Sequence, residues 1–430
     1  MSRHSEARAP WVGLVLLTLV AANGFSYADR YLFSILIPAI KAEFGASDGS
    51  LGLIGGPIFV ISFVALSLPL ARLADRWSRR GVLMLAVVTW SVATALCGVA
   101  ANVVQLGIAR ALVGAGEAGG MPASQAIVSD LYDDRRRSGA MGVLASSTYL
   151  GLVLGIAGGA AIAAAWGWRW AFVLIAAPGL ACALLVALLP LGRRERGGAA
   201  PPALPALTVL RRCWGIPSLR LLALGIGTFN IFAYGAAVWM PAYFIRSHGM
   251  SLVAAGSWLG IGAAVGGFAG SLASGALVDR LRLRGEQWQL SVPAWGFIVS
   301  LPIYMAILLL PGGSAVPVGG AAIPTVALLS VLTALFSSAA MGPAFGAIAR
   351  LVAAEERAQA TAFAIVLINV MGSAFGPLLA GLVSDALGAR FGAESLRYSL
   401  LAMSTLVLAG GLLLLWASLR YPHDLARGAA

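Results

Sequence analysis

The chain has 430 residues, of which 60% are hydrophobic and only 11% are charged. Soluble domains carry about a quarter charged residues, so this composition excludes an ordinary soluble protein and indicates a polytopic membrane protein. The formal net charge of +12 suggests nucleic acid at first sight, but its distribution along the chain favours membrane orientation, and we expect no nucleic-acid partner.

Stretches of about 20 apolar residues recur along the whole chain, each long enough to cross a hydrocarbon core about 30 Å thick. They predict an all-α fold with twelve transmembrane helices. The first run is too long for the apolar core of a signal peptide, so we expect no cleaved leader. The predicted spans lie at roughly 11–39, 51–73, 82–101, 103–128, 138–164, 169–191, 219–245, 253–278, 291–311, 321–350, 358–384 and 395–419.

One long polar connection separates the sixth predicted span from the seventh. It is rich in arginine, proline and glycine, as is typical of a linker. We therefore expect two six-helix bundles, over residues 1–192 and 218–430, joined by a cytoplasmic linker over 193–217.

The basic residues are distributed very unevenly between the two sides of the predicted spans. If the N-terminus is cytoplasmic, the cytoplasmic segments hold 22 of the 29 lysines and arginines and the opposite segments hold five. The remaining two, Arg30 and Arg110, lie within predicted spans. This bias predicts a multi-pass protein of a bacterial inner membrane with both termini in the cytoplasm.

A repeated loop supports the division into two halves. "ARLADRWSRR" after the second span matches "GALVDRLRLR" after the eighth. Parallel repeats of six spans are typical of transporters in which two bundles rock against each other. The charged residues of the two loops predict a conformational gate at the cytoplasmic face, formed by Asp75, Arg76, Arg79, Arg80, Asp279 and Arg280.

Glycines spaced by four occur in the predicted second, fifth, eighth and eleventh spans. Small residues on one ridge let helices approach closely in lipid. Ordinary helix packing explains any single pair of such glycines. The more specific hypothesis is that these four spans form the surface along which the two halves slide. The glycines are Gly52 and Gly56; Gly151, Gly155 and Gly159; Gly262, Gly266 and Gly270; and Gly372 and Gly376.

The segment "SYADRY" places an acid and an arginine within the first predicted span. Charges at membrane depth are costly and usually face a cavity or a partner. Away from the span ends there are four: Asp29, Arg30, Arg110 and Glu117. Asp29 and Arg110 fall at similar depth in the outer half of the membrane, so we expect them to meet, while Glu117 lies nearer the midplane.

Proton coupling needs a group that changes its charge inside the membrane. All three histidines lie in predicted tails or loops, which leaves Asp29 and Glu117 as the candidates. If one carboxylate takes a proton, an arginine becomes free to hold an anion such as a phosphate. We expect Arg110 to carry the substrate charge or to switch between partners, with Arg30 in support. The alternative is that Asp29 and Arg110 form a structural ion pair.

The C-terminal half has no deep charge, and its candidates are polar, aromatic and sulfur-containing side chains. For each of them plain packing is the alternative. An apolar half facing a charged half suits an amphiphile, although an amphipathic drug fits equally well. The candidate cavity-lining residues are Asn230, Tyr234, Trp239, Ser337, Ser338, Met341 and Asn369.

Several motifs resemble those of a known family. "DRWSRR" resembles the signature of the loop between helices 2 and 3 in the major facilitator superfamily. "YADRY", "RALVGAGEAGGMPA", "GWRWAFVLIAAPGL", "WMPAYFIRSHGMSLVAAG" and "INVMGSAFGPLLAGLVSD" resemble its Spinster (sphingolipid and lysolipid transporter-like) branch. A related organic-anion:proton branch also carries an acid–arginine pair in helix 1. The resemblance implies a monomeric, proton-linked carrier of lysophospholipid or sphingoid-type amphiphiles.

No motif points to catalysis. There is no G-x-S-x-G, no P-loop and no His/Cys cluster, so we expect neither an enzyme nor a cofactor or metal. The leading hypothesis is a secondary transporter working by alternating access, with an amphiphilic or anionic substrate, protons and the bilayer as partners. The alternatives are a proton-coupled carrier of small organic anions or drugs and, in another class, a non-transporting membrane sensor or scaffold.

Overall fold

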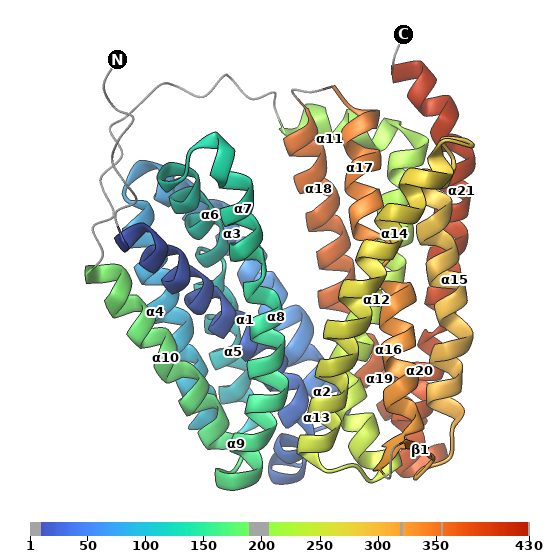
Figure 1. Cartoon of the computed structure of the whole chain (residues 1–430). Helices are drawn as coiled ribbons and strands as arrows, with labels where there is room; N and C mark the ends of the chain where they lie inside the picture. The colour runs from blue at the N-terminus through green and yellow to red at the C-terminus, as the bar shows by residue number, and fades with distance from the viewer. Residues whose placement is uncertain (1–9, 189–205, 319–320, 354–355, 429–430) are drawn as a thin grey trace. The chain divides into compact units, whose positions relative to one another are not determined.

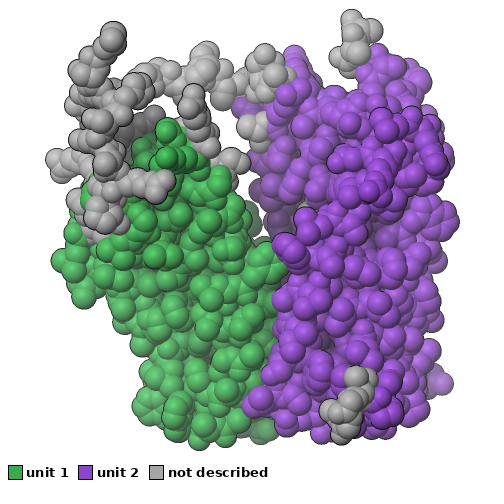
Figure 2. All heavy atoms as spheres, viewed as in Figure 1, with its two compact units in different colours: residues 1–46, 57–197 green, residues 47–56, 198–430 purple. Residues whose placement is uncertain are grey.

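The computed structural model describes residues 10–188, 206–318, 321–353 and 356–428, and these are almost entirely helical (Figure 1). The chain divides into two compact units (Figure 2). Unit 1 comprises residues 1–46 and 57–197, and unit 2 comprises residues 47–56 and 198–430. Of the predicted linker over 193–217, residues 193–205 lie outside the described part of the chain, and a short helix follows them.

In unit 1, α1 packs against α8 and α10, α4 packs against α5 and α10, and α3 packs against α5. The elements are α1 (Pro10–Phe44), α3 (Phe59–Arg76), α4 (Arg79–Gly98), α5 (Val103–Glu117), α6 (Gly120–Leu131), α7 (Asp134–Ala145), α8 (Ser147–Val153), η2 (Leu154–Gly158), α9 (Gly159–Trp166) and α10 (Trp168–Leu188).

In unit 2, α12 packs against α21 and α19, and α15 packs against α21. The elements are α2 (Asp48–Leu53), α11 (Ala206–Gly215), α12 (Pro217–His248), α13 (Leu252–Ile261), η3 (Gly262–Gly266), α14 (Gly267–Arg282), α15 (Trp288–Leu309), β1 (Ala315–Val318), β2 (Ala321–Pro324), α16 (Thr325–Ser337), α17 (Met341–Leu351), α18 (Arg357–Asn369), η4 (Val370–Phe375), α19 (Gly376–Phe391), η5 (Gly392–Glu394), α20 (Ser395–Met403) and α21 (Thr405–Gly428). Between α2 and α3 lies η1 (Ile54–Ile58).

Ten helical stretches of the described residues are long and apolar enough to cross a membrane. These stretches differ from the twelve predicted spans in two places. The span expected over 103–128, which breaks at Ala118–Gly119 between α5 and α6, is not among them. The last two expected spans are counted as one stretch, although the chain turns at Gly392 (φ +52°) and α20 packs back on α19. The predicted all-α polytopic fold class is confirmed.

One predicted boundary is wrong. The span expected over 321–350 begins only at Thr325, because residues 321–324 pair with β1 in an antiparallel hairpin in which Val316 faces Ile323. The small apolar residues on either side of Gly319–Gly320 are compatible with a strand as well as with a helix. Their apolar character favoured a helix that starts at residue 321.

The four glycine-rich helices each contain one π-helical turn, at η1, η2, η3 and η4. A Cβ on Gly155 would meet the carbonyl oxygen of Ala28 in α1, and one on Gly376 would meet that of Ile231 in α12. Both contacts lie within a single unit, so these glycines permit close packing of neighbouring helices there. That the halves slide along these helices stays a hypothesis.

Candidate functional site

The four deep charges form two ion pairs inside unit 1. Arg110 on α5 donates from Nη1 to Asp29 Oδ2 on α1, which confirms that these two residues meet. Arg30 on α1 donates from Nε to Glu117 Oε2 at the end of α5, at 2.5 Å. We call Asp29, Arg30, Arg110 and Glu117 the charge cluster. Each helix contributes one acid and one arginine, and each acid pairs with the arginine of the other helix.

The Asp29–Arg110 pair is almost completely buried. The side chain of Asp29 is 0% exposed and that of Arg110 is 2% exposed. Thr94 of α4 donates to the second carboxylate oxygen of Asp29, Oδ1, at 3.0 Å. The rings of Phe33 and Phe59 lie 5.1 and 5.2 Å from the guanidinium carbon of Arg110. Both oxygens of Asp29 are therefore paired, and the arginine is enclosed by rings.

The Arg30–Glu117 pair is asymmetric. The side chain of Glu117 is 0% exposed, whereas that of Arg30 is 34% exposed. The guanidinium carbon of Arg30 lies 5.1 Å from the ring of Tyr27, 5.0 Å from that of Phe59 and 5.1 Å from that of Phe63. Arg30 is thus the accessible cation of the cluster, and three aromatic rings surround it at cation–π distance.

Glycines bring α5 close enough for these contacts. A Cβ on Gly114 would meet the carbonyl oxygen of Phe59 on α3, and one on Gly116 would come within 2.5 Å of the backbone nitrogen of Trp90 on α4. Glu117 is the last residue of α5, immediately before the break at Ala118–Gly119. The glycine-rich sequence therefore allows α5 to approach α3 and α4 and then ends the helix at the carboxylate.

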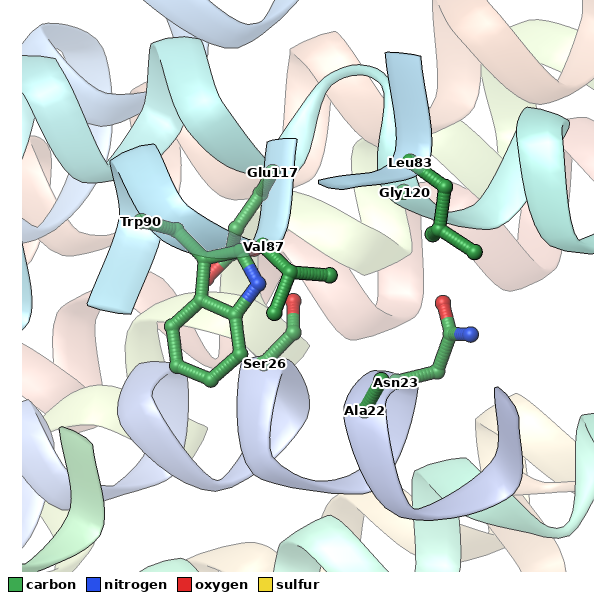
Figure 3. Close-up of a pocket in the computed structure, with 8 residues that line it drawn as sticks. All are labelled: Ala22, Asn23, Ser26, Leu83, Val87, Trp90, Glu117 and Gly120. Atoms are coloured by element: carbon green, nitrogen blue, oxygen red, sulfur yellow. The ribbon is translucent and has the colours of Figure 1, made fainter. Parts of the chain in front are cut away.

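A small cavity lies beside Glu117, and we call it the Glu117 cavity (Figure 3). Its volume is about 10 Å³, room for roughly one water molecule. Asn23 on its wall donates from Nδ2 to Leu19 O and to Ser124 Oγ, both at 2.8 Å. The cavity is lined by Ala22, Asn23 and Ser26 of α1, Leu83, Val87 and Trp90 of α4, Glu117 of α5 and Gly120 of α6.

The predicted gate residues are divided between the two units, with those of residues 75–80 in unit 1 and Asp279 and Arg280 in unit 2. The side chains of Asp75 and Arg76 lie outside the described part of the chain, although both residues belong to α3. Arg79 donates to Asp130 Oδ2 and to Ala126 O on α6. None of the ion pairs among the described residues includes the remaining predicted members, which are Arg80, Asp279 and Arg280.

The candidate lining residues of the C-terminal half lie in different environments. Tyr234 donates to Asn369 Oδ1 at 2.9 Å, and Asn230 is buried against Gly372. Trp239 is 0% exposed and donates to the carbonyl oxygen of Pro377 at 2.9 Å.

Three further candidates complete this set. The hydroxyl of Ser337 donates to the carbonyl oxygen of Ala334 in its own helix, and Ser338 caps the C-terminal end of that helix. The side chain of Met341 lies outside the described part of the chain.

A second polar group was not identified in the sequence. Asp48 at the start of α2 is 1% exposed and accepts two hydrogen bonds from Arg246 of α12, at 3.0 and 3.1 Å, and one from Ser384 of α19, at 2.8 Å. Asp385 accepts from the backbone nitrogens of Asp48 and Gly49 at 2.9 and 2.7 Å. All these residues belong to unit 2, where they hold α2 against α12 and α19.

A model of the Major Facilitator Superfamily matches residues 19–316. An "MFS-type efflux pump" of Mycolicibacterium smegmatis is 32% identical over 433 residues, covering 99% of this chain and 96% of that protein. "Protein spinster homolog 1" of Homo sapiens is 28% identical over 395 residues, covering 87% and 73%. The "probable sulfoacetate transporter SauU" of Cupriavidus necator is 27% identical over 322 residues, covering 69% and 71%.

A solved structure agrees with the fold. The crystal structure of a bacterial homologue of the human lysosomal transporter Spinster, in an inward-facing and unoccupied conformation, superposes with a TM-score of 0.83 at 24% identity. It covers 97% of this chain and 99% of that one. The chain therefore belongs to the major facilitator superfamily of membrane transporters and, within it, resembles the Spinster branch.

Proposed function

We propose that the protein is a proton-coupled secondary transporter that works by alternating access and carries an amphiphile with an anionic group. The observation that carries this proposal is the environment of Arg30. Its guanidinium is partly exposed, pairs with a buried carboxylate and lies among three aromatic rings. A cation in an apolar setting suits a charged headgroup joined to an apolar chain.

Proton coupling follows from the charge balance of the cluster. With all four groups ionised, the cluster is neutral. A proton on Glu117 removes the negative charge that compensates Arg30, so the guanidinium then favours an anion from outside. Proton and anion bind together in this scheme, whereas an anion that displaces Arg30 from an ionised Glu117 is disfavoured by repulsion.

The two carboxylates have different roles in this proposal. Asp29 has both oxygens paired, to Arg110 and Thr94, whereas Oε1 of Glu117 accepts no hydrogen bond from the described residues. Glu117 is therefore the carboxylate with an oxygen available for a proton. Asp29 and Arg110 hold α1 and α5 in register and keep a compensating pair of charges beside it. The substrate cation is then Arg30 rather than Arg110.

A small organic anion is the second candidate substrate. The similarity to a probable sulfoacetate transporter favours it, since a sulfonate or carboxylate would fit the same guanidinium. The aromatic rings around Arg30 favour an amphiphile over so polar a molecule. In either case we propose a monomer in a bacterial inner membrane with both termini in the cytoplasm, on the basis of the uneven distribution of basic residues.

Uptake of a labelled lysophospholipid into proteoliposomes, with and without an imposed pH gradient, tests this function. We expect flux in wild type to depend on the gradient and flux in Glu117→Gln to ignore it. Glu43→Gln is a matched control, because Glu43 pairs with Arg169 at the far end of α1. Gradient-independent flux in wild type would rule out proton coupling, and flux of small anions without lysophospholipid flux would select the second candidate.

A further inference from the structure

The polar groups around the Glu117 cavity are arranged as a site for a water molecule. Oε1 of Glu117 is buried and accepts no hydrogen bond from the described residues. Asn23 uses only Nδ2 in its hydrogen bonds, which leaves Oδ1 as an acceptor. None of the hydrogen bonds among the described residues uses the indole nitrogen of Trp90 or the hydroxyl of Ser26, and both residues line the cavity.

These groups complement one another chemically. Trp90 supplies an N–H donor, Glu117 and Asn23 supply acceptors, and Ser26 can do either. A buried tryptophan N–H usually has a partner, and a buried water typically makes two to four hydrogen bonds. Figure 3 shows the indole nitrogen of Trp90 and the hydroxyl of Ser26 pointing toward the same space. A cavity of about 10 Å³ fits one such molecule.

We infer that this cavity binds a water molecule that relays protons between Ser26 and Glu117. The inference rests on the proposed function, in which Glu117 carries the coupled proton. Glu117 and Trp90 are 3% and 1% exposed, whereas Ser26 is half-buried. Of the groups at the cavity, the Ser26 hydroxyl is thus best placed to exchange protons with the surroundings.

The relay consumes nothing but the proton. A proton from the surroundings binds Ser26 Oγ while the hydroxyl gives its own proton to the water oxygen, and the water passes one of its protons to Glu117 Oε1. The hydroxyl and the water are thereby regenerated, and Glu117 changes from a charge of −1 to neutral. Arg30, Asp29 and Arg110 are the charged groups that face Glu117. Arg30 lies on the other carboxylate oxygen, Oε2, so its ion pair leaves the path to Oε1 open.

Glycine 120 offers a direct way to fill the cavity. A Cβ at Gly120 would have Asn23 Oδ1 as its nearest neighbour at 3.9 Å, so Gly120→Ala adds a methyl group at the cavity wall without a steric clash. Gly142 of α7 is the matched control, because a Cβ there would meet nothing within 4 Å and Gly142 does not line the cavity. Ser26→Ala removes the hydroxyl with almost no change of volume and provides a second, independent variant.

The experiment follows the infrared C=O band of protonated Glu117 in reconstituted bilayers, identified by its loss in Glu117→Gln, during exchange from H₂O to D₂O. We expect Gly120→Ala and Ser26→Ala to slow deuteration of this carboxyl, and gradient-driven flux with it, by roughly tenfold. Gly142→Ala should exchange like wild type, and unchanged melting temperatures would exclude unfolding.

The possible failures are distinguishable. If both cavity variants deuterate Glu117 as fast as wild type does, the water relay is wrong while proton coupling through Glu117 stands. If wild type has no band that Glu117→Gln removes and its flux ignores the gradient, the proposed function is wrong and the relay falls with it.

Discussion

Both terminal nitrogens of Arg246 on α12 donate hydrogen bonds to the carboxylate of Asp48, at 3.0 and 3.1 Å. The two residues lie far apart in the sequence, yet both belong to unit 2, because the short helix α2 packs on α19. Asp385 of α19 in turn accepts from the first backbone N–H groups of α2, where a negative charge is favourable. This pair therefore fixes α2 to the unit that contains the second half of the chain.

Breaking this pair should destabilise unit 2. The side chain of Asp48 is 2% exposed and that of Arg246 is 19% exposed, so Asp48→Asn leaves a poorly hydrated guanidinium. We expect a loss of about 2 to 3 kcal/mol, measured as a fall in the thermal unfolding temperature in detergent. Asp130→Asn is the matched control, because Asp130 also pairs with an arginine, Arg79, but its side chain is more exposed than that of Asp48. Equal melting temperatures for the two variants would contradict the prediction.

The losses of stability caused by Asp29→Asn and Arg110→Gln should be strongly non-additive. Asp29→Asn or Arg110→Gln alone leaves one buried charge uncompensated, at a cost of about 3 to 5 kcal/mol. The double variant removes both charges, so we expect it to be more stable than either single variant. Thermal unfolding of the four proteins gives the coupling energy directly. Additive losses would mean that the two charges do not depend on each other.

The same series separates structure from coupling. If the double variant is folded and its lysophospholipid flux still responds to the pH gradient, Asp29 and Arg110 have a structural role, as the closed geometry of the pair favours. If the folded double variant loses the response, Asp29 takes part in proton coupling, as the sequence-based hypothesis holds.

Arg30→Lys should weaken substrate binding more than it slows turnover. Lysine keeps the charge but loses the planar guanidinium, which can hold an anion with two donors while it packs against rings. We expect KM for lysophospholipid to rise by about tenfold, with a smaller change in kcat. Arg169→Lys is the control, because Arg169 also packs against aromatic rings but lies away from the cluster. An unchanged KM would exclude Arg30 as the substrate cation.

The spans and the Asp29–Arg110 contact could be predicted because the membrane imposes strong rules. A charge in an apolar run is rare enough to be noticed, and its distance from the span end gives its depth. Thr94, Phe59 and Phe63 could not be found this way. In a helix that is apolar all round, the sequence does not show which face meets α1, so these side chains look like any lipid-facing or packed residue.

The polar group around Asp48 was missed for a different reason. Asp48, Arg246 and Asp385 all lie near the ends of predicted spans, where charged residues are normally solvated and carry no signal. Only the packing of α2 on α19 buries Asp48 there. Similarly, the sequence indicates the region around Glu117 only as a glycine-rich stretch, and it does not show that α5 ends there or that Gly116 packs against Trp90.

Glu286, in the turn between α14 and α15, should make stability depend on acid pH. Arg350 donates to its two oxygens at 2.5 and 2.8 Å, and these hydrogen bonds lower the pKa of Glu286 below its ordinary value of 4.5. A lowered folded-state pKa stabilises the protein fully above the unfolded-state pKa, and this stabilisation is lost as the pH falls through the folded-state value. Both side chains are partly exposed, so we expect less than about 1 kcal/mol at neutral pH. The melting temperature of wild type should therefore exceed that of Glu286→Gln slightly at pH about 7, and the difference should shrink below pH about 4. A difference that stays constant or grows toward acid pH would show that the ion pair does not stabilise the folded state.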